Sequence, residues 1–188
     1  MAETHDREAN EIRVNRAPFL TLWASVVAGR MGYDEDEALT LGRAVAGLTA
    51  QSKGRRLGIY QARPESEHEK TREKREAVGA ETVELMDRLI PCVRTEDGLR
   101  ALSKTSPIDP ESVRKYLSGR FKQNLVVVET RLSKLAATYA PGALDQEAMN
   151  VYMRLRPNVP NGREGWGKVG LLDTDAIDRL IAERREMG

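Results

Sequence analysis

The amino-acid sequence predicts a mainly α-helical protein, in which an N-terminal helical hairpin is joined to a C-terminal helical bundle, with one possible short β-hairpin near residues 83–93. Three observations support this class. Apolar residues recur at spacings of three and four along most of the chain, which is the period of a buried helix face. Acidic caps, prolines and glycines stand where helices begin and end. No alternation of strands with helices indicates a parallel sheet.

The length and composition predict one domain without a metal or a disulfide framework. The 188 residues carry 30 Lys and Arg against 29 Asp and Glu, a formal net charge of +1. We expect residues 1–14 to form a flexible arm and 15–188 a single helical domain. One cysteine excludes a disulfide framework within the chain and a zinc site built on cysteines, and both histidines lie in polar stretches. The sequence therefore predicts no metal and no cofactor.

The hydropathy pattern argues against a membrane protein. No apolar run approaches the ~20 residues of a membrane-spanning helix. The opening stretch, MAETHDREANEIR, has no apolar core behind a basic region, so it does not read as a secretory signal. We expect no membrane association and a cytoplasmic location.

Two helices close together in the sequence predict the N-terminal hairpin. The first begins near Pro18, a residue suited to the first helical turn, and ends at Gly32. The second opens with Asp34 and Glu37, which have the spacing of a capping box, and ends at Gly54 or four residues later. A connection of only a few residues makes the two helices antiparallel neighbours.

The middle of the chain carries fewer structural signals. Residues 61–80 hold almost no large apolar side chain and many charges of both signs, which indicates a connector that is either an exposed charged helix or a mobile loop. Two apolar runs flank Asp87 and Arg88, and their spacing favours a β-hairpin over a short helix ended by Pro91. Pro91 would confine the second run to the edge of a sheet.

Four further helices are predicted in the C-terminal half. Each is marked by apolar residues at helical spacing and by a cap, a proline or a glycine at its ends. They begin at Asp109–Pro110 and stop at Gly119, cover about 125–139 and 144–155, and start again at Asp173 after a loop at 158–170.

Two basic stretches on predicted helices are candidate contacts for a polyanion. Lys53, Arg55 and Arg56 surround a glycine at a helix end, where cations also stabilise the helix dipole. A secondary basic face carries Arg114, Lys115, Arg120 and Lys122, and its alternative interpretation is an ordinary solvated helix face. If the two stretches adjoin in space, the combined surface favours phosphate binding.

A third basic stretch lies in a glycine-rich loop. Its glycines follow the G-x-G-x-x-G spacing, but they come after a helix and not after a strand, so we reject a dinucleotide-binding unit. Arg163, Trp166 and Lys168 remain as an aromatic side chain beside two cations, a combination that stacks bases and neutralises phosphates. The alternative is that Trp166 folds back into the core.

Two local features are similar to known helical modules. The segment RMGYDEDEALTLGRAVAG resembles the helical hairpin of HD-type phosphohydrolases, where a metal-binding His-Asp pair would follow, but Leu48-Thr49-Ala50-Gln51 occupies that stretch. This resemblance implies a degenerate hydrolase architecture without metal ligands. The basic turn at Lys53–Gly58 is similar to helix-two-turn-helix modules of ribosomal and DNA-repair proteins, and that similarity implies nucleic-acid binding.

A broader resemblance covers most of the chain. It rests on NRAPFLTLWASVVAGRMGYDEDEALTLGRAVAGLTAQSKGRRLGIY, IDPESVRKYL and LRPNVPNGREGWGKVGLLDTDAI, of which the GWG-x-x-G-x-LD block is the most distinctive. These blocks resemble a family of small, mostly helical bacterial proteins with no assigned activity. The resemblance implies a helical fold and transfers no catalytic residue.

The leading functional expectation is a non-enzymatic protein that binds nucleic acid. No catalytic residue is assigned, because Cys92 beside Pro91 reads as a small apolar residue and the paired aspartates stand at helix starts. The alternative is a protein-interaction module, most simply a homodimer through a stripe of small residues that comprises Gly42, Ala46, Gly47 and Ala50. A hydrolase with degenerate HD-like helices is the third possibility.

Overall fold

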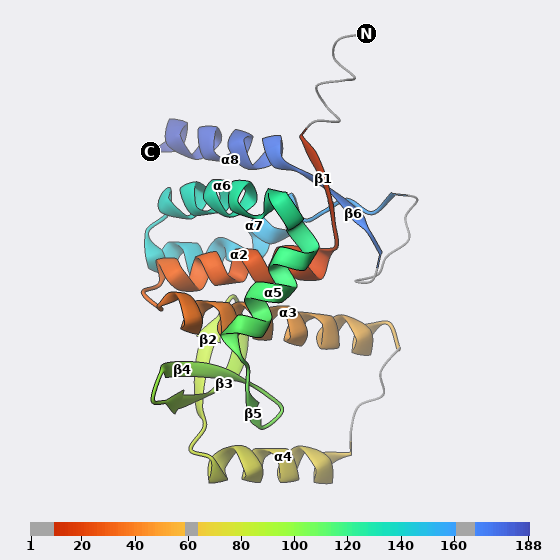
Figure 1. The fold of residues 1–188 in the computed structure, drawn as a ribbon, viewed down its shortest axis with the longest axis vertical. Helices are drawn as coiled ribbons and strands as arrows, with labels where there is room; N and C mark the ends of the chain where they lie inside the picture. The colour runs from red at the N-terminus through yellow and green to blue at the C-terminus, as the bar shows by residue number, and fades with distance from the viewer. Residues whose placement is uncertain (1–9, 59–63, 161–167) are drawn as a thin grey trace.

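Helices and two antiparallel sheets build the fold, so the predicted mainly α class is wrong and the protein is mixed α/β (Figure 1). The computed structural model describes residues 10–58, 64–160 and 168–188. One sheet has two strands and the other has four, in the order β2-β3-β4-β5. One continuous hydrophobic core joins the helices to both sheets.

The N-terminal helical hairpin is present as α2 (Arg16–Arg30) and α3 (Glu35–Arg56). Asp34 and Glu37 form the predicted capping box at the start of α3. Helix α2 lies between α3 on one side and α6 and α7 on the other, and most of its side chains are buried (Figure 1). Its Trp23 is fully buried, and the indole nitrogen donates a 2.9 Å hydrogen bond to the carbonyl oxygen of Ala148. Helix α2 is therefore the central element of the core.

The charged connector forms a helix, α4 (Glu65–Ala77), which is one of the two forms that the sequence left open. None of its side chains is buried. Arg75 holds it to the four-stranded sheet by donating a 3.1 Å hydrogen bond to the carbonyl oxygen of Lys104. Charge and i,i+4 spacing, not burial, support this helix.

The four-stranded sheet consists of β2 (Glu81–Leu85), β3 (Arg88–Thr95), β4 (Gly98–Ser103) and β5 (Ser106–Pro107). The predicted hairpin is present as β2 and β3, but its turn is Met86–Asp87, whose φ angles of 51° and 59° give the twist of a tight hairpin. Pro91 pairs with Thr82 of β2, and pairing of β3 with β4 begins only at Cys92. Pro91 therefore lies in the half of β3 that pairs with β2 alone, where its missing N–H interrupts no pairing with β4.

The C-terminal half adds α5 (Pro110–Phe121), the short 3-10 helix η1 (Lys122–Asn124), α6 (Leu125–Ala137), α7 (Pro141–Leu155), β6 (Gly170–Asp173) and α8 (Thr174–Met187). The predicted stop at Gly119 is wrong: α5 continues for two residues because Phe121 is buried in the core. Asp109 and Asp173 cap their helices as the sequence indicated.

The predicted flexible arm over residues 1–14 is wrong for its last part. Strand β1 (Glu11–Val14) pairs antiparallel with β6, from Glu11 opposite Asp173 to Val14 opposite Gly170. The Asn10 carbonyl oxygen accepts hydrogen bonds from the backbone and the hydroxyl of Thr174, at 3.1 and 2.8 Å. This pairing holds the beginning of the described chain against its last helix.

No helix within the described ranges combines the length and apolar character that crossing a membrane requires.

Candidate nucleic-acid interface

Helix α5 places the basic residues of the secondary face on different sides, because successive helical residues turn by about 100°. Its buried face carries Val113, Leu117 and Phe121. Arg114 and Tyr116 leave the helix on opposite flanks of that face, and Lys115 is exposed on the outer side. The four predicted cations therefore do not form one continuous patch.

Arg114 is paired with acidic side chains. Its guanidinium donates a hydrogen bond to Asp36 and forms ion pairs with Glu35 at 3.6 Å and Glu111 at 3.5 Å. The hydrogen bond with Asp36 is the main reason why the pKa of Arg114 is raised. We therefore exclude Arg114 from the candidate interface, because its charge is already neutralised within the chain.

On the other flank of α5, two arginines lie over the ring of Tyr116. The Cζ atom of Arg43, from α3, lies 4.5 Å from the centre of the Tyr116 ring, and that of Arg120 lies 5.6 Å from it. Burial raises the pKa of Tyr116, and the positive charges of both arginines oppose that rise. The ring is attractive to both cations and so keeps two like charges on one surface.

A pocket of about 630 Å³ opens beside these residues, where β1, the end of α5 and η1 meet. Its basic side chains are Arg13, Arg120 and Lys122, and it has one acidic side chain, Glu11. We define the α5 basic surface as this trio together with its neighbours on α3 and α5: Arg13, Arg43, Lys115, Arg120 and Lys122. Within the described parts of the chain, none of these five residues forms an ion pair.

Lys122 has an unfavourable backbone conformation. Its φ of 52° and ψ of −132° lie in a region that a side chain disfavours and that glycine adopts readily. Such strain costs about 1–3 kcal/mol and is concentrated at functional sites. Here it turns the chain sharply between α5 and η1, and the Lys122 side chain lines the basic pocket.

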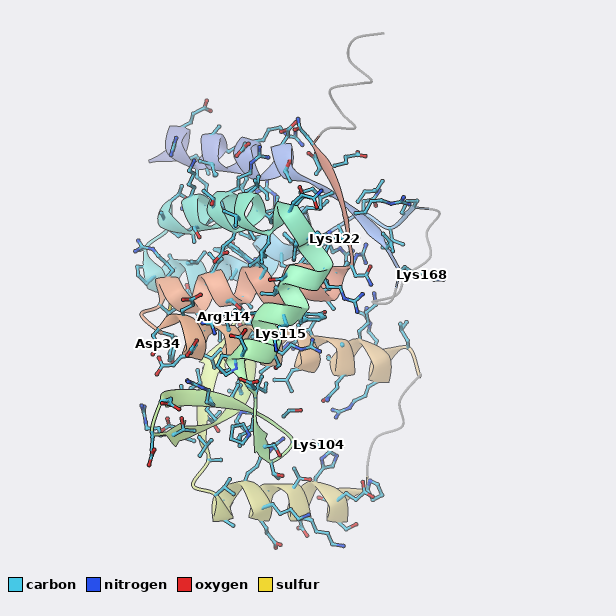
Figure 2. The ribbon with its side chains drawn as sticks, in the orientation of Figure 1. Asp34, Lys104, Arg114, Lys115, Lys122 and Lys168 are labelled. Carbon is cyan, nitrogen blue, oxygen red and sulfur yellow. The ribbon has the colours of Figure 1, made fainter. Side chains whose placement is uncertain are left out.

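The remaining predicted contacts lie in two other places. Arg55 is in the last turn of α3, roughly 18 Å along the helix axis from Arg43. The whole basic turn of Lys53, Arg55 and Arg56 is therefore separate from the pocket. Lys168 precedes Val169, which lines the pocket, and Figure 2 shows Lys168 beside β6 and Lys115 and Lys122 along α5. Arg163 and Trp166 lie outside the described residues.

Sequence reasoning missed Arg13 and Arg43. Arg13 was assigned to the arm, although the alternation of exposed Glu11 and Arg13 with the more buried Ile12 and Val14 is the period of a strand. This alternation was a usable signal. No such signal exists for Arg43, because its contact with Tyr116 arises only where α5 crosses α3 in the folded structure.

The residues considered for catalysis have structural roles. Cys92 is fully buried in β3, where its Sγ donates to the carbonyl oxygen of Ile90 at 3.5 Å. Burial, followed by the nearby charge of Glu81, raises the pKa of the Cys92 thiol to about 12. The thiol therefore stays protonated at neutral pH and is a poor nucleophile. Among the described residues, no cluster of three or more His, Cys, Asp or Glu side chains could hold a metal ion.

Comparison with known proteins adds no relative: no family model, no curated protein and no solved structure matches the chain.

Proposed function

We propose that the protein binds nucleic acid, and that the α5 basic surface contacts the phosphate backbone. The observation that carries this proposal is the gathering of three cations, Arg13, Arg120 and Lys122, around one pocket, without ion-pair partners in the described chain. Arg43 adds a fourth positive charge nearby, because it shares the Tyr116 ring with Arg120. Phosphate oxygens are the ligands that such a group of Arg and Lys side chains would bind.

Several arginines elsewhere in the described chain, by contrast, are paired with acidic side chains. Arg94, Arg131, Arg154 and Arg179 all lie within 4 Å of a carboxylate. The cations around the pocket lie beside an aromatic ring or are exposed to solvent. Helix α6, which begins directly after the pocket residue Asn124, also has no acidic residue in its first turn, so its positive end is not neutralised there.

The net charge of +1 limits the kind of binding that we expect. A protein that is nearly neutral overall has no large attractive field, so affinity depends on local phosphate contacts. These contacts carry no base information by themselves, and binding should weaken steeply as salt is raised.

The test is to measure binding of labelled single-stranded and duplex DNA and RNA at ~50 and ~200 mM salt. The variant R120Q/K122Q removes two cations of the surface, and K70Q/K74Q on α4 is a control with the same change in net charge. We expect R120Q/K122Q to weaken binding and to reduce the salt slope by about 1.8 for duplexes and about 1.4 for single strands. K70Q/K74Q should bind as the parent does.

A third variant, R55Q/R56Q, distinguishes the contribution of the pocket to binding from that of the basic turn at the end of α3. A larger loss in R120Q/K122Q than in R55Q/R56Q supports the α5 basic surface as the main contact. Equal losses in all three variants would mean that only net charge matters, and absence of binding at the lower salt would refute the proposal.

A further inference from the structure

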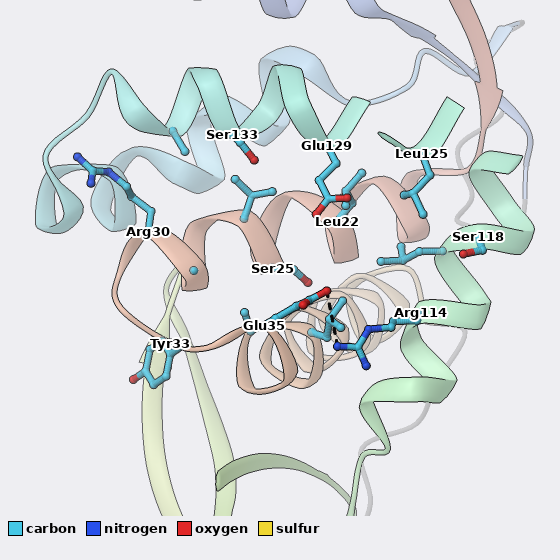
Figure 3. A pocket seen from close by; sticks show the side chains of 16 residues that line it. Leu22, Ser25, Arg30, Tyr33, Glu35, Arg114, Ser118, Leu125, Glu129 and Ser133 are labelled. Atoms are coloured by element: carbon cyan, nitrogen blue, oxygen red, sulfur yellow. Dashed lines mark ion pairs between the residues drawn. The ribbon is translucent and has the colours of Figure 1, made fainter. Parts of the chain in front are cut away.

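A second cavity lies on the opposite flank of α5. It has a volume of about 460 Å³, is partly open to solvent and is lined by α2, α3, α5 and α6 (Figure 3). Cavities of this size accommodate small organic molecules. Its walls are mainly apolar and are formed by Leu22, Val26, Ala38, Leu39, Leu117, Leu125 and Ala136.

Two carboxylates line this space, and both keep contact with solvent, the Glu35 side chain being 78% exposed. Figure 3 shows Glu129 projecting from α6 toward Glu35, which projects from the start of α3. Within the described chain, Glu129 has no hydrogen-bond or ion-pair partner. Burial is the main cause that raises the pKa of Glu129, and the negative charge of Glu35 raises it further. The two acidic groups therefore destabilise each other when both are charged.

The positive groups at the cavity are already engaged elsewhere. Arg114 pairs with Glu35, but the same guanidinium also binds Asp36 and Glu111. Arg30 donates a 2.9 Å hydrogen bond to the carbonyl oxygen of Tyr139. The charge that remains available to a ligand is therefore negative, and it lies at Glu129.

We propose that this cavity binds a small organic cation, with its ammonium group at Glu129 and Glu35 and its apolar body against the leucines of the walls. A bound ammonium would donate hydrogen bonds to a carboxylate that has no other partner and would offset the repulsion between the two acids. The apolar walls would favour an alkyl or aromatic body over a polyamine. Carboxylates and phosphates would be excluded by the same two negative groups.

Three probes of similar shape and different charge test this inference: 2-phenylethylamine, 2-phenylethanol and 3-phenylpropanoate. Their binding to the full chain is measured by calorimetry and by chemical-shift perturbation in NMR spectra. We expect the amine to bind about tenfold more tightly than the alcohol. The carboxylate should not bind. Equal binding of all three probes, or no saturable binding of the amine, would overturn the proposal.

Two variants assign the binding to this cavity. Glu129→Gln should lower the affinity for the amine to that for the alcohol and leave the alcohol unchanged, whereas Glu186→Gln, an exposed change on α8, should alter neither. Gly29 lines the cavity at the last turn of α2, and a side chain there meets no atom within 4 Å. Gly29→Leu should therefore fill the cavity and abolish binding of both probes while the protein stays folded.

Thermal unfolding and circular dichroism check that each variant is folded. Retained amine binding in a folded Gly29→Leu variant would place the amine elsewhere and refute the site. Equal losses in Glu129→Gln and Glu186→Gln would show that the attraction is not local. The nucleic-acid experiment uses different residues, so either proposal can fail without the other.

Discussion

At Lys122, an unfavourable backbone conformation coincides with a side chain of the proposed binding surface. Its backbone is held at a φ of 52° and a ψ of −132°, while its side chain supplies a cation to the pocket between α5 and β1. Glycine would adopt the same backbone angles without strain, because they mirror an extended conformation that is common for other residues. The chain therefore carries a side chain where backbone energetics favour glycine, and that side chain places a positive charge at the pocket.

We predict that K122G is more stable than the parent and binds nucleic acid less well. Relief of the backbone strain should raise the free energy of unfolding by about 1 kcal/mol. K122A removes the same charge but keeps a Cβ, so its stability should change by less than about 0.5 kcal/mol. Urea unfolding of both variants measures the difference. A loss of stability in K122G would contradict the assignment of strain to this residue.

The ionisation of Asp173 makes the stability of the last helix depend on pH. Its carboxylate accepts the backbone N–H groups of Asp175 and Ala176, at 3.0 and 3.2 Å, and a hydrogen bond from Arg179 at 2.7 Å. Burial alone would raise the pKa of Asp173, but the bonds from Arg179 and the two amides outweigh it and lower the pKa. The charged form is therefore favoured in the folded state.

Because the pKa of Asp173 is lower in the folded than in the unfolded protein, its charged carboxylate stabilises the fold. This contribution is complete above the pKa of the unfolded chain, near ~3.9, and is lost as the pH falls through the folded pKa. D173A should lower the free energy of unfolding at neutral pH by about 1 kcal/mol, as the loss of a helix cap does. The difference in the free energy of unfolding between the parent and D173A should become smaller as the pH is lowered into the acid range. Urea titrations at several pH values measure it, and a gap that is constant with pH would contradict this role.

At the scale of elements, the contact between α2 and α3 depends on one glycine. A Cβ at Gly42 would lie 2.1 Å from the Ser25 hydroxyl oxygen and 2.5 Å from the carbonyl oxygen of Thr21, so the two helices approach too closely for a side chain. A Cβ at Gly47, five residues further along α3, would meet no atom within 4 Å. The absence of a side chain at Gly42 therefore allows α2 and α3 to pack closely within the chain.

This difference predicts opposite effects for two identical substitutions. G42A should lower the free energy of unfolding by about 1–3 kcal/mol, because the helices must separate. G47A should raise it by up to about 1 kcal/mol, because alanine favours the helix and nothing obstructs it. Chemical denaturation of the two variants is the measurement. A stabilised G42A would mean that α2 and α3 do not pack as described.

The elements that the sequence predicted are those specified by neighbouring residues. Capping at Asp34 and Asp109 and the helical spacing of apolar residues are local signals, and the corresponding helices are present. Strand β4 was missed although Asp97–Gly98 is a typical turn pair, because its apolar residues, at Leu99, Ala101 and Leu102, alternate imperfectly. The predicted hairpin turn lies one residue too late, at Asp87–Arg88 instead of Met86–Asp87, because Met rarely adopts the positive φ that it has here.

The elements and contacts that were not predicted depend on distant partners. Strands β1 and β6 form a two-stranded sheet, and nearly the whole chain lies between them. The candidate interface has the same property, because Arg13, Arg43 and Arg120 come from three segments that only the fold brings together. Local patterns identified the basic residues of α5 but not their neighbours.

At the scale of the whole molecule, local stability should be lowest at α4 and high at the first strand. Helix α4 buries no side chain, whereas Val14 of β1 is 3% exposed and its strand is paired along its length. Hydrogen exchange measured by mass spectrometry should show fast exchange in 65–77 and protection in 11–14. Peptides covering Ile108 and α5 provide a reference for the core. Exchange of 11–14 as fast as that of α4 would indicate an arm, not a strand.

The pairing of β1 with β6 also dictates the order of events during synthesis. Val14 is translated before its partner Gly170, which follows roughly 150 residues later, or about 10–30 s at ordinary translation rates. During that interval the helical hairpin of α2 and α3 can form, while the strand before it has no partner. Strand β1 therefore reaches its native pairing only after β6 has been translated.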